Sequence, residues 1–169
     1  MNALLLPVRD GEGWVWPQLR VATSKEPGAG LGLFARVPLR TGTMIPYIGQ
    51  PATGPGTHVF QGVDGHPHLD PHRQVGSRGW SVAAMANEPL RKTPRCILSR
   101  GCLVVAHPVR AGEELTVYYG DGYQRHYSLA GNRHLERVGR RLDKRRLLSE
   151  RQVAAAVAAA VAAAARPSG

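Results

Sequence analysis

Short apolar runs, separated by turn residues, dominate the chain up to about residue 127. Alternation in "WVWPQLRVA" predicts a strand that ends near Ala22. Glycines and prolines divide "SKEPGAGLGLFARVPLRTGTMIPYIGQ" into strand, turn and strand, with the turn at "RTGT". The segments "CLVVAHPV" and "LTVYY" predict two further strands around a turn at "RAGEE", whereas residues 51–79 are rich in loop signals. This part of the chain is therefore predicted to be mostly β, with short elements.

The pattern changes from about Leu129 onward. Apolar residues recur near helical spacing, and arginines and lysines fill the other face. An almost pure alanine run follows, and alanine has the highest helix propensity. The recurring apolar residues are Leu135, Val138, Leu142, Leu148, Val153, Val157 and Val161. We therefore predict one long helix, or two, and divide the chain into a lead-in strand (1–20), a central domain (21–127) and a basic, then alanine-rich helical tail (128–169).

The charge of the chain favours acidic partners without choosing among them. With 22 basic and 12 acidic residues, the formal net charge is +10 over 169 residues. Such a balance suits nucleic acid, chromatin or an anionic surface, but it is also common in merely soluble proteins. The basic run from Arg133 to Arg151 is most simply a solvated helix face. Alternatively, it makes a weak nucleic-acid contact or packs on another subunit.

Cysteine usage and hydropathy exclude several classes. Cys96 and Cys102 form no CxxC pair, which argues against a cysteine zinc site and against a disulfide scaffold. The histidines of "HPHLDPH" alternate in a polar, proline-interrupted loop, so we expect them to be solvated and predict no metal site. The start of the chain lacks the basic region and cleavage site of a signal peptide. The alanine-rich end is too weakly apolar to insert reliably in a bilayer, so we predict no membrane partner.

Tyrosine is concentrated in one place. Four of the five tyrosines lie in "AGEELTVYYGDGYQRHY", Ala111 to Tyr127. Two other pieces precede this one: "GLGLFA" (Gly30 to Ala35) and "MANEP" (Met85 to Pro89). Taken singly, each has an ordinary interpretation: a tyrosine pair at the end of a strand, a glycine turn before a core strand, and an asparagine turn before proline.

In this order and spacing, the three pieces resemble motifs of the SET-domain protein lysine methyltransferases. "VPLRTGTMIPYIGQ" is similar to the continuation of the first motif, and "GEELTVYYG" is close to the third. The resemblance covers roughly residues 20–127. It implies a mostly β SET fold, with small sheets around a pseudoknot, followed here by a C-terminal helical tail. No cysteine-rich element follows, as in the minimal SET proteins of large DNA viruses and some bacteria, so the lid would come from the segment after Tyr123 or from a second subunit of a homodimer.

The resemblance also implies roles for individual residues. Tyr119 matches the catalytic tyrosine, and Tyr47 matches a tyrosine that lines the lysine channel. Asn87 matches the asparagine that binds the amino-acid part of S-adenosylmethionine. The remaining cofactor contacts implied are Gly30, Leu31, Gly32, Phe34 and Tyr123, with Tyr127 as an alternative closing residue. The chain departs from the family where His-Ser would follow the asparagine, since Glu88 and Pro89 stand there.

The implied reaction moves a methyl group from a sulfonium to a neutral lysine amine. A nearby positive sulfonium lowers the lysine pKa, because like charges disfavour protonation. In-line attack makes positioning a large part of the rate, and a channel of aromatic rings supplies it.

We therefore predict a protein-lysine N-methyltransferase whose protein substrate is a histone tail, which would place it in the nucleus. One alternative is methylation of a non-histone protein. Another is an inactive SET-like binding module, which would bind the cofactor weakly or not at all. A third is a DNA-binding protein that uses the basic tail, with an affinity that falls steeply with salt.

Overall fold

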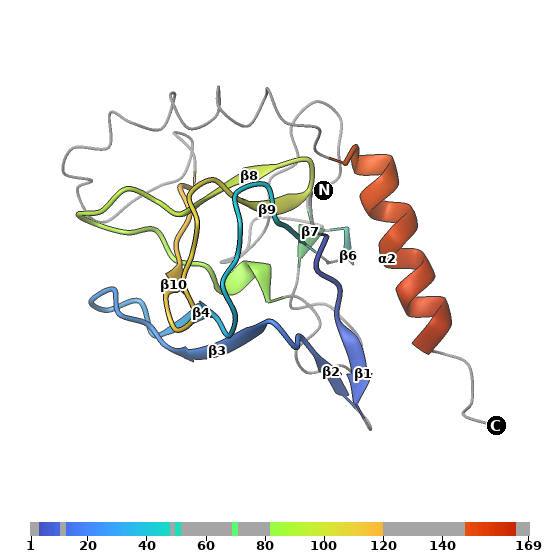
Figure 1. Ribbon diagram of the computed structural model, residues 1–169, viewed down its shortest axis with the longest axis horizontal. Helices are drawn as coiled ribbons and strands as arrows, with labels where there is room; N and C mark the ends of the chain where they lie inside the picture. The colour runs from blue at the N-terminus through green and yellow to red at the C-terminus, as the bar shows by residue number, and fades with distance from the viewer. Residues whose placement is uncertain are drawn as a thin grey trace.

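The computed structural model describes residues 4–10, 13–47, 50–51, 69–70, 82–119 and 148–164. Within them the chain forms small antiparallel sheets and a C-terminal helix (Figure 1). The predicted mostly β architecture with a helical end is confirmed. The elements are β1 (Val8–Asp10), β2 (Gly13–Val15), β3 (Leu19–Thr23), β4 (Leu31–Ala35), β5 (Met44–Pro46), β6 (Gln50–Pro51), β7 (Leu69–Asp70), η2 (Ala83–Met85), β8 (Cys96–Ser99), β9 (Cys102–Val105), β10 (Glu114–Leu115) and α2 (Glu150–Ala164).

The first of two three-stranded sheets has the order β10-β4-β3. Its central strand is the "LGLFA" run, which pairs antiparallel with β3 from Leu19↔Ala35 to Thr23↔Leu31. On the other edge, Glu114 lies opposite Phe34. A continuous apolar run suits this central position, because Leu33, Phe34 and Ala35 are all buried.

The second sheet has the order β5-β9-β8. Its hairpin, β8-β9, closes through Arg100 and Gly101, which both have positive φ values (54° and 68°). Two consecutive positive φ values are typical of the tight hairpin turn whose twist matches that of the strands. The Arg100 guanidinium donates to the carbonyl oxygen of Leu148 at 3.4 Å, so this turn also holds the segment before α2.

Two similar turns lie at opposite ends of a short antiparallel pairing (Figure 1). The predicted turns at "RTGT" and "RAGEE" are confirmed, with positive φ at Gly42 (89°) and Gly112 (80°). Leu39 and Val109, just before the turns, exchange both backbone hydrogen bonds at 2.8 and 3.0 Å. This pairing fixes the turns relative to each other.

Residues 116–117 connect the sheets. The Val117 N–H donates to the Asn87 carbonyl at 2.9 Å, and the Cys96 N–H donates to the Thr116 carbonyl at 2.8 Å. Parallel bridges accordingly join Asn87 to Thr116 and Cys96 to Val117. The chain from Asn87 to Cys96 therefore contacts both edges of residues 116–117, and it runs around the strand that leads to Tyr119.

The core lies where these elements meet. Leu33, Ile45, Leu103, Val105 and Leu115 are fully buried in one cluster that takes residues from both sheets. Val153 of α2 belongs to a second cluster. Figure 1 shows α2 along one edge of the molecule, beside β1. No helix of the described residues is long and apolar enough to cross a membrane.

The structure corrects one sequence prediction and narrows another. The strand over "WVWPQLRVA" is instead β2 and β3, with a turn at Pro17 and Gln18 between them, because proline has no N–H to donate to a ladder. Of the two alternatives for the tail, one continuous helix through Leu148 is excluded, because α2 begins at Glu150. Ser149 caps the start of α2: its backbone N–H donates to Gln152 Oε1 at 2.8 Å, and its hydroxyl accepts the Gln152 N–H at 3.3 Å. Residues 120–147 lie outside the described part of the chain.

Candidate functional site

Asn87 contacts both of the other motifs. Its Nδ2 donates to the Leu31 carbonyl at 2.8 Å and to Glu114 Oε1 at 3.4 Å. A carbonyl and a carboxylate only accept, so the amide nitrogen must face them and Oδ1 must point elsewhere. "GLGLFA", "MANEP" and "AGEELTVYYG", which lie far apart in the sequence, thus meet at one side chain.

Glu114 is the carboxylate at this junction. Although it is buried, it accepts hydrogen bonds from the Ser24 hydroxyl at 2.5 Å and from the Lys25 N–H at 2.7 Å, besides the contact with Asn87. Removing a carboxylate from water costs several kcal/mol in real proteins, about as much as a few charge-assisted hydrogen bonds return. Glu114 lies in β10 and joins three segments.

The glycine motif "GLGLFA" lies beside Glu114. Gly30 has φ +73°, a conformation that side chains rarely adopt. A Cβ on Gly32 would collide with the Glu114 carboxylate and would lie 3.2 Å from the Ser24 Cα. Gly32 is therefore needed for the approach of Glu114, and the cofactor contact that the resemblance implies for Gly32 stays a prediction.

The two apolar residues predicted to cover a cofactor differ in exposure. The Leu31 side chain is 57% exposed and lies next to the Asn87 contact, so it is available to a ligand. Phe34 is buried, with the Arg20 guanidinium 5.0 Å and the Lys25 ammonium 5.8 Å from the ring centroid. These cations are within the range of cation–π attraction. The ring face that they cover is not open to a ligand in this structure.

Tyr119 lies against the segment that carries Asn87. Its hydroxyl donates to the Ala86 carbonyl at 3.1 Å, and its backbone N–H donates to Glu88 Oε1 at 2.9 Å. The ring is half-buried and packs against the main core cluster. The structure thus brings together Tyr119 and Asn87, which the sequence predicts at the catalytic and cofactor positions.

Tyr47 belongs to the same core cluster. Its side chain is buried, and its N–H donates to the Gly101 carbonyl at 2.8 Å, at the β8-β9 turn. Tyr119 packs against the cluster that contains Tyr47, so both predicted channel tyrosines border one apolar region. Tyr123 and Tyr127 lie outside the described residues, and the lid expected from that segment stays a prediction.

Histidines and cysteines are the candidates for metal and thiol chemistry in this chain. Among the described residues, no group of three or more histidine, cysteine or acidic side chains could hold a metal ion. His66, His68 and His72 lie outside the described residues. Cys96 and Cys102 are both free and buried, and burial raises the pKa of the Cys96 thiol well above its usual range. A thiol held protonated in this way is a poor nucleophile.

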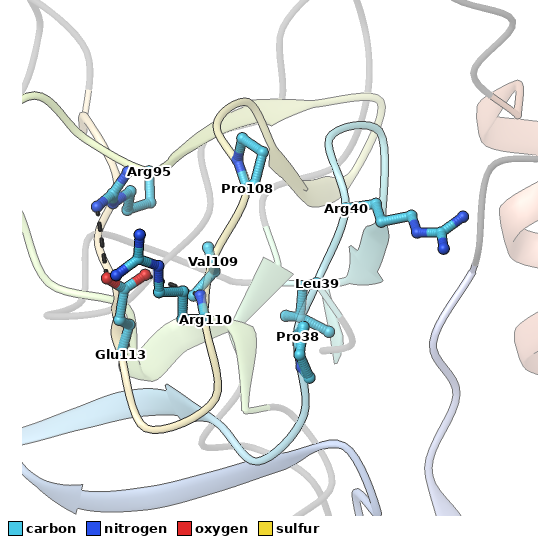
Figure 2. A pocket seen from close by; sticks show the side chains of 8 residues that line it. All are labelled: Pro38, Leu39, Arg40, Arg95, Pro108, Val109, Arg110 and Glu113. Carbon is cyan, nitrogen blue, oxygen red and sulfur yellow. Dashed lines mark hydrogen bonds and ion pairs between the residues drawn. The ribbon is translucent and has the colours of Figure 1, made fainter.

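A separate pocket of about 460 Å³ opens beside the paired turns (Figure 2). Its lining residues are Pro38, Leu39, Arg40, Arg95, Pro108, Val109, Arg110 and Glu113. Arg95 forms an ion pair with Glu113 at 3.6 Å. The Arg110 N–H donates to the Glu113 carboxylate and, as the main cause, lowers the pKa of that group. None of the residues expected at the catalytic and cofactor site lines this pocket.

Sequence reasoning missed two residues of the site. Ser24 contacts Glu114 across 90 positions of the chain, and no local pattern marks such a pair. Glu88 was noted only as a departure from the family motif. Its burial, although it is a charged residue, emerges only from the fold.

Comparisons with known proteins find similarity only among solved structures. No family model matches the chain, and no curated protein does. The methyltransferase domain of human PR domain-containing protein 2 has a TM-score of 0.49 and 14% identity, and the match covers 66% of this chain and 83% of that one. ATXR5, in complex with mono-methylated histone H3.1, has a TM-score of 0.46 and 19% identity over 67% of this chain and 61% of that one.

KRYPTONITE, in complex with mCHH DNA, a histone H3 peptide and SAH, has a TM-score of 0.43 and 20% identity. That match covers 63% of this chain and 23% of the other. At TM-scores this low, the likeness carries no argument about fold or function. Inferences about this chain rest on its own residues.

Proposed function

We propose that the chain is a SET-type protein-lysine N-methyltransferase that takes its methyl group from S-adenosylmethionine. The observation that carries the proposal is the Asn87 side chain, which contacts the Leu31 carbonyl in the first motif and Glu114 in the third. Three motifs recognised by their order in the sequence are thus adjacent in space. Asn87 is only half-buried, so its side chain is not enclosed in the core.

The surroundings of Asn87 fit the amino-acid end of S-adenosylmethionine. The Leu31 carbonyl and the Glu114 carboxylate both take hydrogen bonds from Nδ2, so Oδ1 is left as an acceptor with no partner among the described residues. An acceptor of this kind suits the ammonium of a methionine moiety. Leu31, exposed beside it, would give apolar cover. When bound, S-adenosylmethionine supplies the methyl group and a positive charge.

Tyr119 is suited to orient the lysine amine. A phenol has a single proton, and that of Tyr119 is donated to the Ala86 carbonyl. The oxygen can then only accept further hydrogen bonds, and an amine N–H is a donor. Tyr47, in the core cluster against which Tyr119 packs, would wall the channel for the apolar lysine stem. Positioning of this kind supplies much of the rate in a displacement reaction.

Histone tails are the preferred substrate in this proposal, because the resembled family acts on them. The net charge of +10 is a mild point against a basic tail, and it favours the second candidate, a non-histone protein. An inactive SET-like module is the candidate outside the enzyme class. The cofactor affinity separates it from the enzyme, because an inert module should bind S-adenosylmethionine weakly or not at all.

The test is methyl transfer from radiolabelled S-adenosylmethionine to mixed histones, with Tyr119→Phe and Tyr118→Phe as a matched pair. Both changes delete one phenol oxygen, from neighbouring residues of the chain. We expect transfer to fall at least about a hundredfold in Tyr119→Phe and less than about threefold in Tyr118→Phe. Equal losses in the two variants would contradict the role given to Tyr119. Labelling of a non-histone protein alone would move the proposal to the second substrate.

A further inference from the structure

The departure from the family motif at Glu88 lies in direct contact with Tyr119. We infer that Glu88 is a positioning residue, which holds Tyr119 for the methyl transfer that we propose, and the inference rests on that proposed function. The Glu88 side chain is only 4% exposed, and its Oε1 accepts the backbone N–H of Tyr119 at 2.9 Å. A carboxylate is rarely buried unless specific donors hold it, so this contact is more than incidental packing.

The same segment also binds the hydroxyl group of the Tyr119 side chain. Its hydroxyl donates to the carbonyl of Ala86, two residues before Glu88, at 3.1 Å. The backbone and the phenol oxygen are therefore fixed by positions on either side of Asn87. Two attachment points restrict the tilt of the ring axis, which one attachment would leave free.

Pro89 makes the Glu88 contact rigid. A proline disfavours helical backbone in the residue before it, which limits the conformations of Glu88. Pro89 is itself fully buried, so the end of the segment is anchored in the protein. The pair Glu88-Pro89 thus forms a fixed acceptor for the Tyr119 N–H.

Residues 86–88 therefore support both the cofactor side of the site, at Asn87, and the tyrosine side, at Tyr119. Asn87, between Ala86 and Glu88, is fixed by Leu31 and Glu114. Loss of the Glu88 contact would leave the cofactor side in place while the tyrosine side loosened. Misplacement of a reacting group lowers the rate of the chemical step more than it weakens binding. We therefore expect an effect on kcat and little effect on KM.

The experiment compares Glu88→Asp, Glu88→Gln and the control Glu26→Asp. Asp keeps the charge but is one methylene too short to reach the Tyr119 N–H, whereas Gln keeps an acceptor at full length. Glu26 Oε2 accepts the backbone N–H of Leu90 at 3.3 Å, so Glu26→Asp removes the same methylene from a carboxylate that holds the same segment without touching Tyr119. Labelled S-adenosylmethionine and mixed histones provide kcat and both KM values.

We expect Glu88→Asp to lower kcat about tenfold or more, with both KM values within about threefold of wild type. Glu88→Gln and Glu26→Asp should keep kcat within about threefold. An unchanged kcat in Glu88→Asp would overturn the inference. So would an equal loss in Glu26→Asp, which would show that any loosening of the segment suffices, or an equal loss in Glu88→Gln, which would remove the acceptor from the explanation.

Amide hydrogen exchange at Tyr119 tests the contact without any activity. We expect faster exchange of this N–H in Glu88→Asp and an unchanged rate in Glu26→Asp. If wild type transfers no methyl group, the proposed function fails while this measurement still stands. If exchange at Tyr119 is the same in Glu88→Asp and wild type, the positioning role fails whether or not the protein is active.

Discussion

Glu114 and Gly32 form a close pair at the scale of single residues. One oxygen of the Glu114 carboxylate, Oε1, accepts from Ser24 and Asn87, and the other, Oε2, accepts from the Lys25 N–H. The carboxylate can lie this close to the backbone of Gly32 only because glycine has no side chain. The motif "GLGLFA" therefore has a structural requirement at its second glycine that is separate from any ligand.

Replacing Gly32 with Ala should destabilise the fold strongly. The new Cβ would meet the Glu114 carboxylate on one side and the Ser24 backbone on the other, and overpacking of this kind costs about 2–3 kcal/mol. Gly28→Ala is the control, because Gly28 has open space around it but a φ of +75°, which should cost about 1 kcal/mol. Urea unfolding measures both. A cost for Gly32→Ala no larger than that for Gly28→Ala would contradict this role.

The sequence motifs indicated residues that the structure places close together, but not the contacts between them. Asn87 and Tyr119 were identified from motifs. In the structure, Tyr119 contacts the segment that carries Asn87. The contact of Ser24 with Glu114 and the burial of Glu88 depend on chain segments that meet only in the folded protein. Local sequence patterns carry no information about such pairs.

At the scale of elements, the predictions failed where a single residue interrupts a regular pattern of apolar positions. Alternation in "WVWPQLRVA" is genuine, but Pro17 ends the ladder, and the sequence pattern was extended across it. In the tail, apolar spacing continued past Ser149, although a serine three residues before a glutamine is a start signal for a helix. The turns at Gly42 and Gly112 were predicted, because glycine marks each turn. Of the strand predicted over "LTVYY", only Leu115 lies in β10.

Helix α2 should depend on the Ser149 cap. Ser149→Ala removes the acceptor for the Gln152 N–H, and the loss of such a cap costs about 1 kcal/mol of helix stability. Amide exchange in the first turn of α2 should quicken accordingly. Arg151→Ala, at an exposed position of the same turn, is the control and should leave exchange unchanged. Equal protection in Ser149→Ala and wild type would contradict the capping role.

At the scale of the whole molecule, residues 116–117 hold the two sheets and the site together. They contact Asn87 on one edge and Cys96 on the other, just before Tyr119. The sequence could indicate this only through the family resemblance, because composition and periodicity do not report how one segment runs around another. The net charge of +10 describes the chain as a whole and does not select the substrate.

Binding of S-adenosylmethionine tests the central claim most directly, because it does not require knowledge of the methyl acceptor. We would titrate S-adenosylmethionine into the wild-type chain and into Asn87→Ala by calorimetry, with circular dichroism to confirm that both are folded. We expect saturable binding by wild type and a Kd raised at least about tenfold, about 1.4 kcal/mol, in Asn87→Ala. No binding by the folded wild-type chain, or equal Kd values for the two proteins, would contradict the account.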